Sequence, residues 1–331
     1  MKILATVKKI PGGLMVVPLL LGVMTNTFFP GFLQFGGLTS ALFAPAAAST
    51  IIAVCMFAIG TSINLRQAGT MIKRGTVLLL AKFFAGAAVG LLIGRFFGLG
   101  GIMGISALAI VSSVTNSNGG LHMSLAGTFG DAEDVGAQAL LSINDGPFLT
   151  MLAFGVSGLA AIPVKSLVAS VIPILFGMIL GNLDPDIADF CRPAGSVLIP
   201  FFAFPLGAAI SIQNLVTGGI RGILLGLFCV LWSGLVCILA DRYINKRPGY
   251  AGAAIASAAG NCVATPALVA AATDTMLPYV ESATVQCAAA VIVTTICVPI
   301  LTSWAVKKWG DGPTFNAKRS VGKPAEAPVS K

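Results

Sequence analysis

The sequence predicts an all-α polytopic membrane protein of about ten transmembrane helices, arranged as two inverted five-helix repeats. Composition is the first observation: the 331 residues are 56% hydrophobic and 10% charged, with a mean hydropathy of +0.93. Soluble chains carry about 25% charged residues. Second, the apolar runs between charges are long enough to cross a bilayer of roughly 30 Å. Third, the two halves of the chain share an ordered series of matching residues.

Ten apolar runs, separated by Gly, Pro and charged residues, predict spans centred near residues 22, 54, 86, 112, 149, 173, 205, 232, 260 and 293. An even number of spans places both termini on one side of the membrane. Sixteen Lys and Arg residues then lie in segments on that side and three on the other, with Lys82 inside a span. Because cytoplasmic segments hold the excess of Lys and Arg, both termini are expected in the cytoplasm.

The two halves align at low identity. "VPLLLGVMTNTFFP" (17–30) matches "IPILFGMILGNLDP" (172–185), which pairs Gly22 with Gly177, and "FAIGTSINLRQAGTMIKRG" (57–75) matches "FPLGAAISIQNLVTGGIRG" (204–222). Five spans per half require the second half to enter the membrane from the opposite side, as in the inverted repeats of alternating-access transporters. The expected division is a first repeat at 1–160, a second repeat at 161–306 and a disordered cytoplasmic tail at 307–331.

The fourth and ninth spans are each interrupted. No Asp, Glu, Lys or Arg lies between Phe96 and Gly130, yet "SSVTNSNGGLH" (112–122) occupies the middle of that run, and the repeat places it opposite "AAGNCVATPAL" (258–268). Irregular backbone at membrane depth persists only where protein buries it or it lines a cavity. Half-helices beginning near Gly120 and Pro266 would direct free N–H groups toward an anion. Paired interruptions therefore predict a binding site.

The predicted substrate-binding residues are polar or Gly positions of these interruptions and of the fifth span: Asn116, Ser117, Asn118, Gly119, Gly120, His122, Asn144, Asn261 and Thr265. An alternative is that Ser, Thr and Gly here only allow close helix packing, which we expect for Ser112 and Ser113. His122 could bind substrate, carry a proton or be structural.

Two charged residues are predicted to take part in proton coupling. Asp145, in "LLSINDGPFLT", is the only formal charge between Val135 and Val164, and a carboxylate inside a membrane indicates function by default. The alternative places Asp145 nearer to the membrane surface. Lys82, in the third span, could pair with Asp145 or with a substrate anion, or it could extend to the cytoplasmic surface.

Several function classes are not expected. The seven Cys lack metal-ligand spacing and the single His cannot build a His-rich centre, so no metal site, catalytic residue or cofactor is predicted. The net charge of +8 forms no basic face, so nucleic acid is not an expected partner. Without nucleotide-binding or hydrolase motifs, the chain is expected to be a transporter driven by a gradient rather than an enzyme. The oligomeric state stays open, with a homodimer as one alternative.

Four motifs together resemble the bacterial 2-keto-3-deoxygluconate permeases, from about Lys8 to the end of the tenth span: "KKIPGGLMVVPLLLGV", "TNSNGG", "LLSINDGPF" and "ASAAGNCVATPA". The resemblance implies proton symport of a small sugar-acid anion across the bacterial inner membrane. It also implies a relation to the bile-acid sodium symporter fold, in which a panel domain and a core domain hold the site at crossing helices 4 and 9.

Sodium-binding members of that fold carry an acidic residue in the crossing of the ninth span, whereas residues 260–266 contain none. This departure favours protons, with Asp145 as the preferred carrier. A sodium-coupled organic anion symporter and a passive channel for small anions remain as alternatives, and a membrane enzyme is a third.

Overall fold

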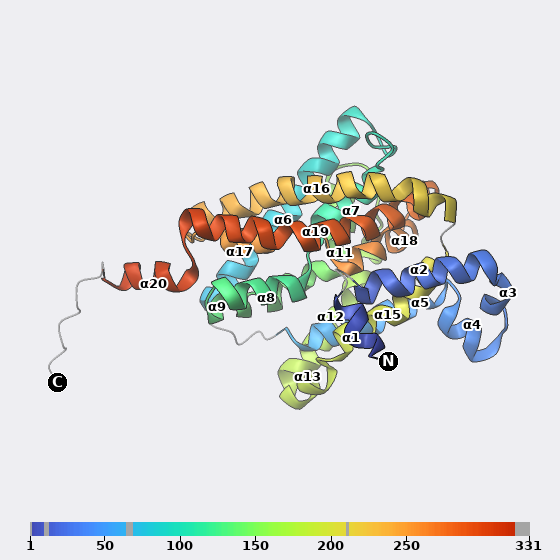
Figure 1. Ribbon diagram of the computed structural model, residues 1–331, viewed down its shortest axis with the longest axis horizontal. Helices are drawn as coiled ribbons and strands as arrows, with labels where there is room; N and C mark the ends of the chain where they lie inside the picture. Colours follow the sequence, from blue (N-terminus) through green and yellow to red (C-terminus); the bar gives the residue numbers. More distant parts are fainter. Residues whose placement is uncertain (1, 10–12, 64–68, 210–211, 322–331) are drawn as a thin grey trace.

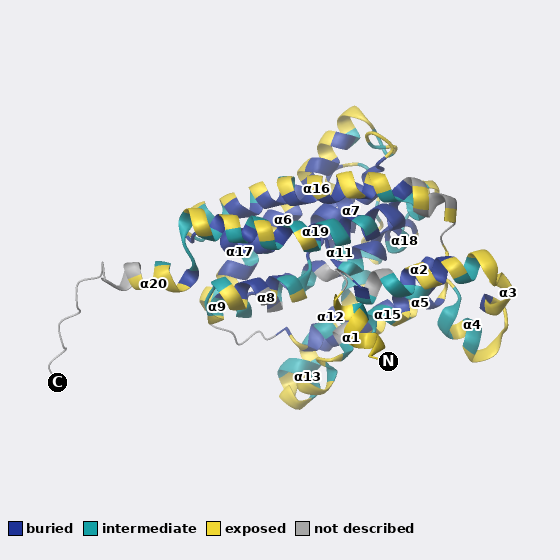
Figure 2. Ribbon diagram, in the orientation of Figure 1, coloured by how far each residue is buried: buried dark blue, intermediate teal, exposed yellow. Residues whose placement is uncertain are grey.

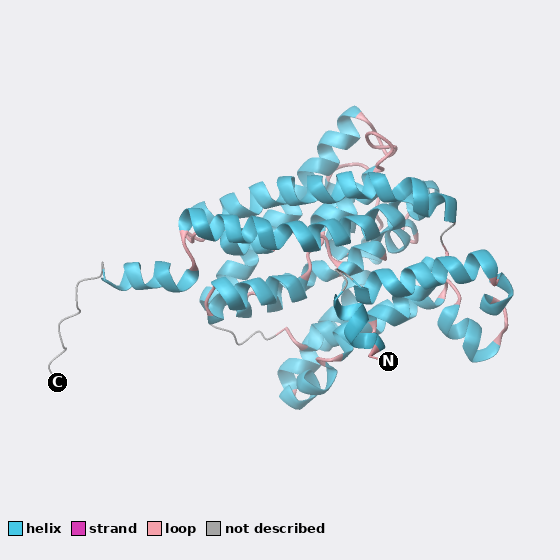
Figure 3. Ribbon diagram, viewed as in Figure 1, coloured by secondary structure: helices cyan, strands magenta, loops and turns pink. Residues whose placement is uncertain are grey.

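The computed structural model describes residues 2–9, 13–63, 69–209 and 212–321, and within these ranges the secondary structure is helical with no strand (Figure 3). The first half contains α1 (Ile3–Lys9), α2 (Gly13–Phe28), α3 (Pro30–Leu33), α4 (Gly37–Phe43), α5 (Ala47–Thr61), α6 (Gly69–Phe96), α7 (Ala107–Thr115), α8 (Gly119–Phe129), α9 (Ala132–Gly136), α10 (Gln138–Leu141), the 3-10 helix η1 (Ser142–Asp145) and α11 (Phe148–Val156). The second contains α12 (Val164–Leu183), α13 (Pro185–Cys191), α14 (Ala194–Val197), α15 (Ile199–Gly207), α16 (Ile212–Tyr243), α17 (Tyr250–Ala254), η2 (Gly260–Val263), α18 (Thr265–Ala270), η3 (Asp274–Tyr279), α19 (Val280–Trp309) and α20 (Gly312–Val321).

Four described helical segments are long and apolar enough to cross a membrane: Gly69–Phe96, Val164–Leu183, Gly218–Tyr243 and Asp274–Ala317. The pair α4 and α5, bent by 66°, would form a fifth span. Large apolar side chains remain exposed on these helices, and the most apolar stretch of α12 is only 11% buried. Such surfaces are typical of contact with lipid. The chain is therefore a multi-pass membrane protein.

The helices form two groups (Figure 1). Helices α2, α5, α12 and α15 pack on one another and are called the four-helix group. Helices α6, α7, α8, α11 and α16 to α19 form the larger group, in which α16 packs along both α19 and α6. The short helices η1 and η2 belong to interrupted segments of the larger group, and they contact α5 and α15 of the four-helix group. The interruptions therefore lie where the two groups meet.

Glycine allows the close crossings inside the four-helix group. In α2, a side chain at Gly22 would collide with the carbonyl of Phe204 in α15. In α5, a side chain at Gly60 would collide in the same way with the carbonyl of Ile174 in α12. Two further glycines close the same crossings from the opposite helix: Gly207 against α2 and Gly177 against α5. Small residues at such crossings let the backbones approach, as is common in membrane proteins.

The most deeply buried part of the molecule surrounds the interruptions (Figure 2). Every residue of α7 is buried, as is the segment 255–259 after α17. Helix α7 lies tightly on α6 because Gly86 leaves room for the side chain of Thr115. The broken backbone is thus enclosed by protein, as unpaired polar backbone at membrane depth requires.

The chain after residue 306 differs from the expected disordered tail. Helix α19 continues to Trp309, and α20 extends from Gly312 to Val321. The side chain of Asn316 in α20 joins Arg247 at 2.7 Å and Asp131 at 2.9 Å. These bonds hold a segment whose composition alone favours disorder. Residues 322–331 lie outside the described part of the chain.

Candidate functional site

The first interruption separates α7 from α8 by three residues. Helix α7 ends at Thr115, and Asn116 adopts an extended conformation. Asn118 then caps α8: its side-chain oxygen accepts a hydrogen bond of 3.0 Å from the N–H of Leu121. Asn is a preferred residue at this position because it satisfies one of the free N–H groups of a new helix. The half-helix begins at Gly119, one residue from the predicted start.

The second interruption begins earlier than the sequence indicated. Helix α17 already ends at Ala254, and irregular backbone and η2 follow before α18 begins at Thr265 with Pro266 in its first turn. Thr265 is buried and donates its hydroxyl to the carbonyl of Asn261 at 3.2 Å. Proline suits a helix start because its missing N–H would have no partner there. The predicted start near Pro266 is confirmed.

The two interruptions meet in space. The N–H of Asn118 donates to the hydroxyl oxygen of Ser257 at 2.9 Å, although the residues are 139 positions apart. Helix α7 also contacts both η2 and α18. The chain therefore brings both predicted segments to one place, between the larger group and the four-helix group.

The fifth predicted span is interrupted as well, and it packs against the first interruption. Asn144 in η1 accepts a hydrogen bond of 2.9 Å from the hydroxyl of Ser117. Thr150 in α11 accepts from the amide of Asn116 at 3.2 Å and lies 2.6 Å from the hydroxyl of Thr115. All five side chains are buried. Asn144 thus lies against the first interruption, and its role in binding substrate stays a prediction.

Several polar atoms at this junction are buried without a hydrogen-bond partner among the described residues. They are the side-chain oxygen of Asn116 and the side-chain nitrogen of Asn144. The ring of His122, one turn into α8, is also buried but lies beside Gln138 of α10. An unsatisfied buried donor or acceptor costs about 1–3 kcal/mol. Because the cluster offers both donors and acceptors, it is suited to a polar ligand with hydroxyl or carbonyl groups.

The remaining predicted residues border the buried cluster. Gly119 and Asn261 are half-buried and Gly120 is exposed, so they lie at the accessible edge of the interruptions. Ser112 and Ser113 are fully buried inside α7. The Ser113 hydroxyl donates to the Cys287 thiol at 3.4 Å, which fits the packing role expected for Ser113, whereas the Ser112 hydroxyl has no hydrogen-bond partner among the described residues.

Of the two residues predicted to take part in proton coupling, the structure describes the side chain of Lys82 but not that of Asp145. The backbone of Asp145 ends η1, but its side chain lies outside the described part of the structure. Lys82 is fully buried, and its ammonium donates to the hydroxyl of Ser233 at 3.1 Å and to the carbonyl of Ser257 at 3.0 Å. The alternative in which Lys82 extends to the membrane surface is therefore wrong. Tertiary packing of α16 and the 255–259 segment covers it.

Three polar residues of this site were missed by the sequence analysis: Thr150, Ser233 and Ser257. Thr150 and Ser257 lie within the motifs "LLSINDGPFLT" and "ASAAGNCVATPA", but outside the breaks that the sequence predicts. Ser233 lies in the apolar helix α16, where a lone hydroxyl usually bonds its own backbone, as this one does to Cys229. Only the position of Lys82 opposite Ser233 distinguishes it.

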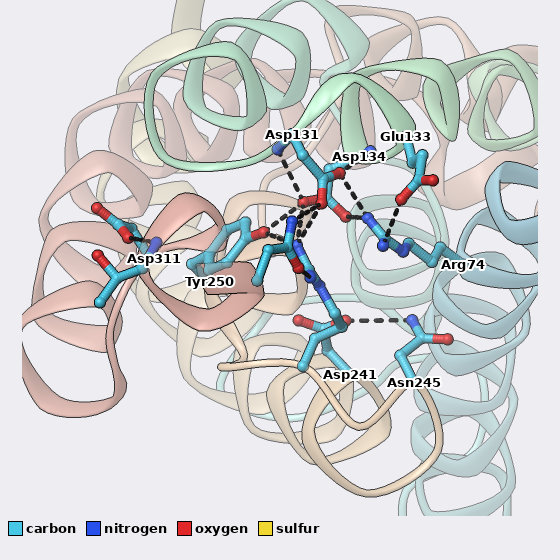
Figure 4. Close-up of polar contacts among 11 residues, drawn as sticks. Arg74, Asp131, Glu133, Asp134, Asp241, Asn245, Tyr250 and Asp311 are labelled. Carbon is cyan, nitrogen blue, oxygen red and sulfur yellow. Dashed lines mark hydrogen bonds and ion pairs between the residues drawn. The ribbon is translucent and has the colours of Figure 1, made fainter. Parts of the chain in front are cut away.

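A second polar cluster lies at the α9 end of the larger group (Figure 4). Arg74 contacts Asp131, Glu133 and Asp134, each at 2.6 Å, and Arg247 contacts Asp131 and Asp134 at 2.9 Å. Within this acidic loop, the Asp134 side chain is 2% exposed, whereas that of Glu133 is 41% exposed. Tyr250 donates its hydroxyl to Asp134. This ion-pair cluster ties α6, α9, α17 and α20 together.

The charges of the ion-pair cluster act on Asp131. Burial favours the neutral acid, but hydrogen bonds from Asn316 and Arg74 outweigh it and hold the pKa of Asp131 well below its ordinary value. Asp131 is therefore ionised at neutral pH, as its two Arg partners require.

Comparisons with known proteins identify the family. The family described as KdgT: 2-keto-3-deoxygluconate permease matches residues 4–311. A protein of Salmonella typhimurium named 2-keto-3-deoxygluconate permease 1 is 45% identical over 308 residues, covering 93% of this chain and 96% of that protein. The 2-keto-3-deoxygluconate permease of Bacillus subtilis is 43% identical over 314 residues, covering 93% and 94%. That of Escherichia coli O9:H4 is 39% identical over 314 residues, covering 93% and 95%.

The match extends over nearly all of the described helices and includes both interruptions. Together with the apolar helices, it indicates a transporter that takes a small molecule through a lipid bilayer. The chain belongs to the 2-keto-3-deoxygluconate permease family.

Proposed function

We propose that this protein imports 2-keto-3-deoxygluconate by proton symport, with the substrate bound at the junction of the two interrupted segments. The observation that carries the proposal is the contact between Asn118 and Ser257, which joins the interruptions beside buried polar atoms without partners. The names of the relatives support this choice of substrate.

The chemistry of the junction is suited to a small sugar acid. Such an anion presents a carboxylate, a ketone and several hydroxyls. The free oxygen of Asn116 can accept from a hydroxyl, and the free nitrogen of Asn144 can donate to a carbonyl or carboxylate oxygen. Free N–H groups at the start of α8, near Gly119 and Gly120, favour a negative charge. His122 supplies a further donor or acceptor.

We also propose that the ten predicted spans form two inverted repeats, related to the bile-acid sodium symporter fold. The four-helix group would be the panel domain and the larger group the core domain. The matched glycines support this symmetry: Gly22 of α2 packs on α15, and its counterpart Gly177 of α12 packs on α5. Movement of one group against the other would expose the junction alternately to each side.

Proton coupling is assigned to Asp145, the carboxylate next to Asn144. It would load a proton on the outer side and release it inside, with no cofactor and with the proton gradient as energy source. The excess of Lys and Arg on one side supports an orientation with both termini in the cytoplasm, and we propose the bacterial inner membrane as the location. Sodium coupling and a passive channel are the alternative mechanisms.

Uptake of labelled 2-keto-3-deoxygluconate into membrane vesicles tests the proposal, with pH and sodium gradients imposed separately. Accumulation is expected under an inwardly directed proton gradient at zero sodium. Accumulation only under a sodium gradient would favour the sodium symporter, and equilibration without accumulation would favour a channel. Vesicles without the protein are the control.

A further inference from the structure

Lys82 is a buried cation at the centre of the membrane protein. It lies in the middle of α6, and its side chain is fully enclosed. On α16 the thiols of Cys229 and Cys237 are close enough to interact electrostatically with Lys82. Among the side chains that the structure describes, no carboxylate forms an ion pair with Lys82. An unpaired charge in such a place is costly and indicates a function.

The ammonium is held by neutral oxygens instead. Ser233 donates its own proton to the carbonyl of Cys229 at 2.7 Å, so its lone pairs face Lys82 and accept at 3.1 Å. The carbonyl of Ser257, in the irregular segment 255–259, accepts at 3.0 Å. Hydroxyls and the carbonyls of unwound helices are the ligands that bind small cations in transporters with broken helices.

Ser257 connects this cation to the other interruption. While its carbonyl accepts from Lys82, its hydroxyl accepts from the N–H of Asn118, the residue that caps α8. Without the ammonium, the carbonyl of Ser257 would lose a charge-assisted bond in a buried position, which is where such bonds are strongest. The position of Ser257, and with it the contact between the two interruptions, therefore depends on Lys82.

We propose that the Lys82 ammonium is a resident cation, which occupies a monovalent cation site formed by Ser233 and Ser257 and holds the two interrupted segments together. The inference rests on the proposed function only in taking this junction as the transport site. A tethered cation cannot leave with the substrate, so the junction is organised without sodium and carries a fixed positive charge for an anion.

The experiment removes the Lys82 side chain and tests whether cations added in solution can replace its ammonium. Lys82→Ala is purified in detergent, and its unfolding midpoint is measured at constant ionic strength in the chlorides of choline, sodium, potassium, ammonium and methylammonium. In choline the variant is expected to unfold at least about 5 °C below the wild type. Sodium, ammonium or methylammonium should restore about half of this loss in a saturable way. The wild type should not distinguish these salts.

Matched variants separate the cation site from general destabilisation. Lys82→Met fills the space of the lysine stem without a charge, so its midpoint should fall without recovering in any salt. Lys73→Ala removes an exposed lysine of the same helix and should change neither the midpoint nor the salt response. If Lys82→Ala does not fold, Lys82→Ser is the second variant that vacates the site.

Three outcomes would overturn the proposal. The first is a Lys82→Ala midpoint that equals the wild type in choline, and the second is a lowered midpoint that no cation raises. The third is a Lys82→Ala, Asp145→Asn double variant that regains wild-type stability in choline, because Lys82 would then be the ion-pair partner of Asp145.

A transport measurement distinguishes this inference from the proposed function. Sodium should stimulate the rate of uptake by Lys82→Ala in vesicles at least about tenfold more than it stimulates uptake by the wild type. If the wild type fails to transport the sugar acid, the proposed function is wrong, but the unfolding series still decides whether Lys82 fills a cation site.

Discussion

At the scale of single residues, the junction combines satisfied and unsatisfied polar groups. Asn118 uses its oxygen to cap α8, whereas Asn116 and Asn144 each keep one amide atom without a partner in the described structure. The sequence predicts the same substrate-binding role for all three residues, because an Asn side chain by itself gives no sign of whether a helix will use it as a cap. Only the fold separates the capping group from the two groups left without a partner.

Asn144→Ala removes a free donor from the junction, and we expect substrate affinity to fall about tenfold, the equivalent of one hydrogen bond. Binding of labelled substrate to purified protein measures this. Asn245→Ala, which changes an amide two residues beyond the end of α16, is the control and should bind normally. Equal affinities in both variants would remove Asn144 from the substrate site.

Asp145→Asn should abolish accumulation driven by a proton gradient, because an amide cannot load a proton, while substrate exchange without a gradient remains measurable. Counterflow and gradient-driven uptake in the same vesicles separate the two. Asp274→Asn changes an exposed carboxylate at the start of η3 and should leave both activities intact. Unchanged proton-driven uptake in Asp145→Asn would exclude the carrier role.

At the scale of elements, the starts of the half-helices were predictable and the extent of the second break was not. Asn before Gly-Gly and Thr before Pro are start signals that local chemistry enforces. The segment 255–259, by contrast, is rich in Ala, and this composition by itself favours a helix. It is irregular here because its polar backbone finds partners elsewhere, as in the bond from Ala258 to Thr294.

Asn118→Ala removes the cap of α8, and we expect a loss of about 1 kcal/mol in stability together with weaker substrate binding. Asn118→Ser keeps a capping oxygen and should retain stability. Thermal unfolding and substrate binding of both variants test this. A stable Asn118→Ala protein would show that the cap contributes nothing to the junction.

The ion-pair cluster joins elements that are far apart in the sequence, so its acidic loop could not be recognised as buried. Arg247→Ala should cost about 3 kcal/mol, because it leaves Asp134 buried with part of its charge uncompensated. It should also release α20 to proteolysis. Arg192→Ala breaks an exposed pair with Asp189 and should have little effect on unfolding. Similar losses of stability in both variants would show that the buried ion pairs of Arg247 contribute no more than the exposed pair of Arg192.

At the scale of the whole molecule, two helix groups meet at the interruptions, and glycine crossings define the smaller one. Gly177→Val would place a side chain against the carbonyl of Phe57 in α5, where backbone cannot yield. We expect folded protein in the membrane to fall severalfold, as fluorescence-detected size exclusion would measure. Gly155→Val, at a glycine with open space around it, should be tolerated. Normal yields of Gly177→Val would mean that the crossing is loose.

The sequence by itself determined the membrane class and the starts of the half-helices after the two breaks, and the resemblance of four motifs indicated the family. The first two follow from composition and local backbone chemistry, which act over a few residues. The tertiary structure alone decided that Lys82 is enclosed, that Ser257 links it to Asn118, and that Asp134 is buried between two arginines. Each of these depends on which distant side chains share a low-dielectric space, where a few ångströms decide whether a charge is solvated, paired or held by neutral oxygens.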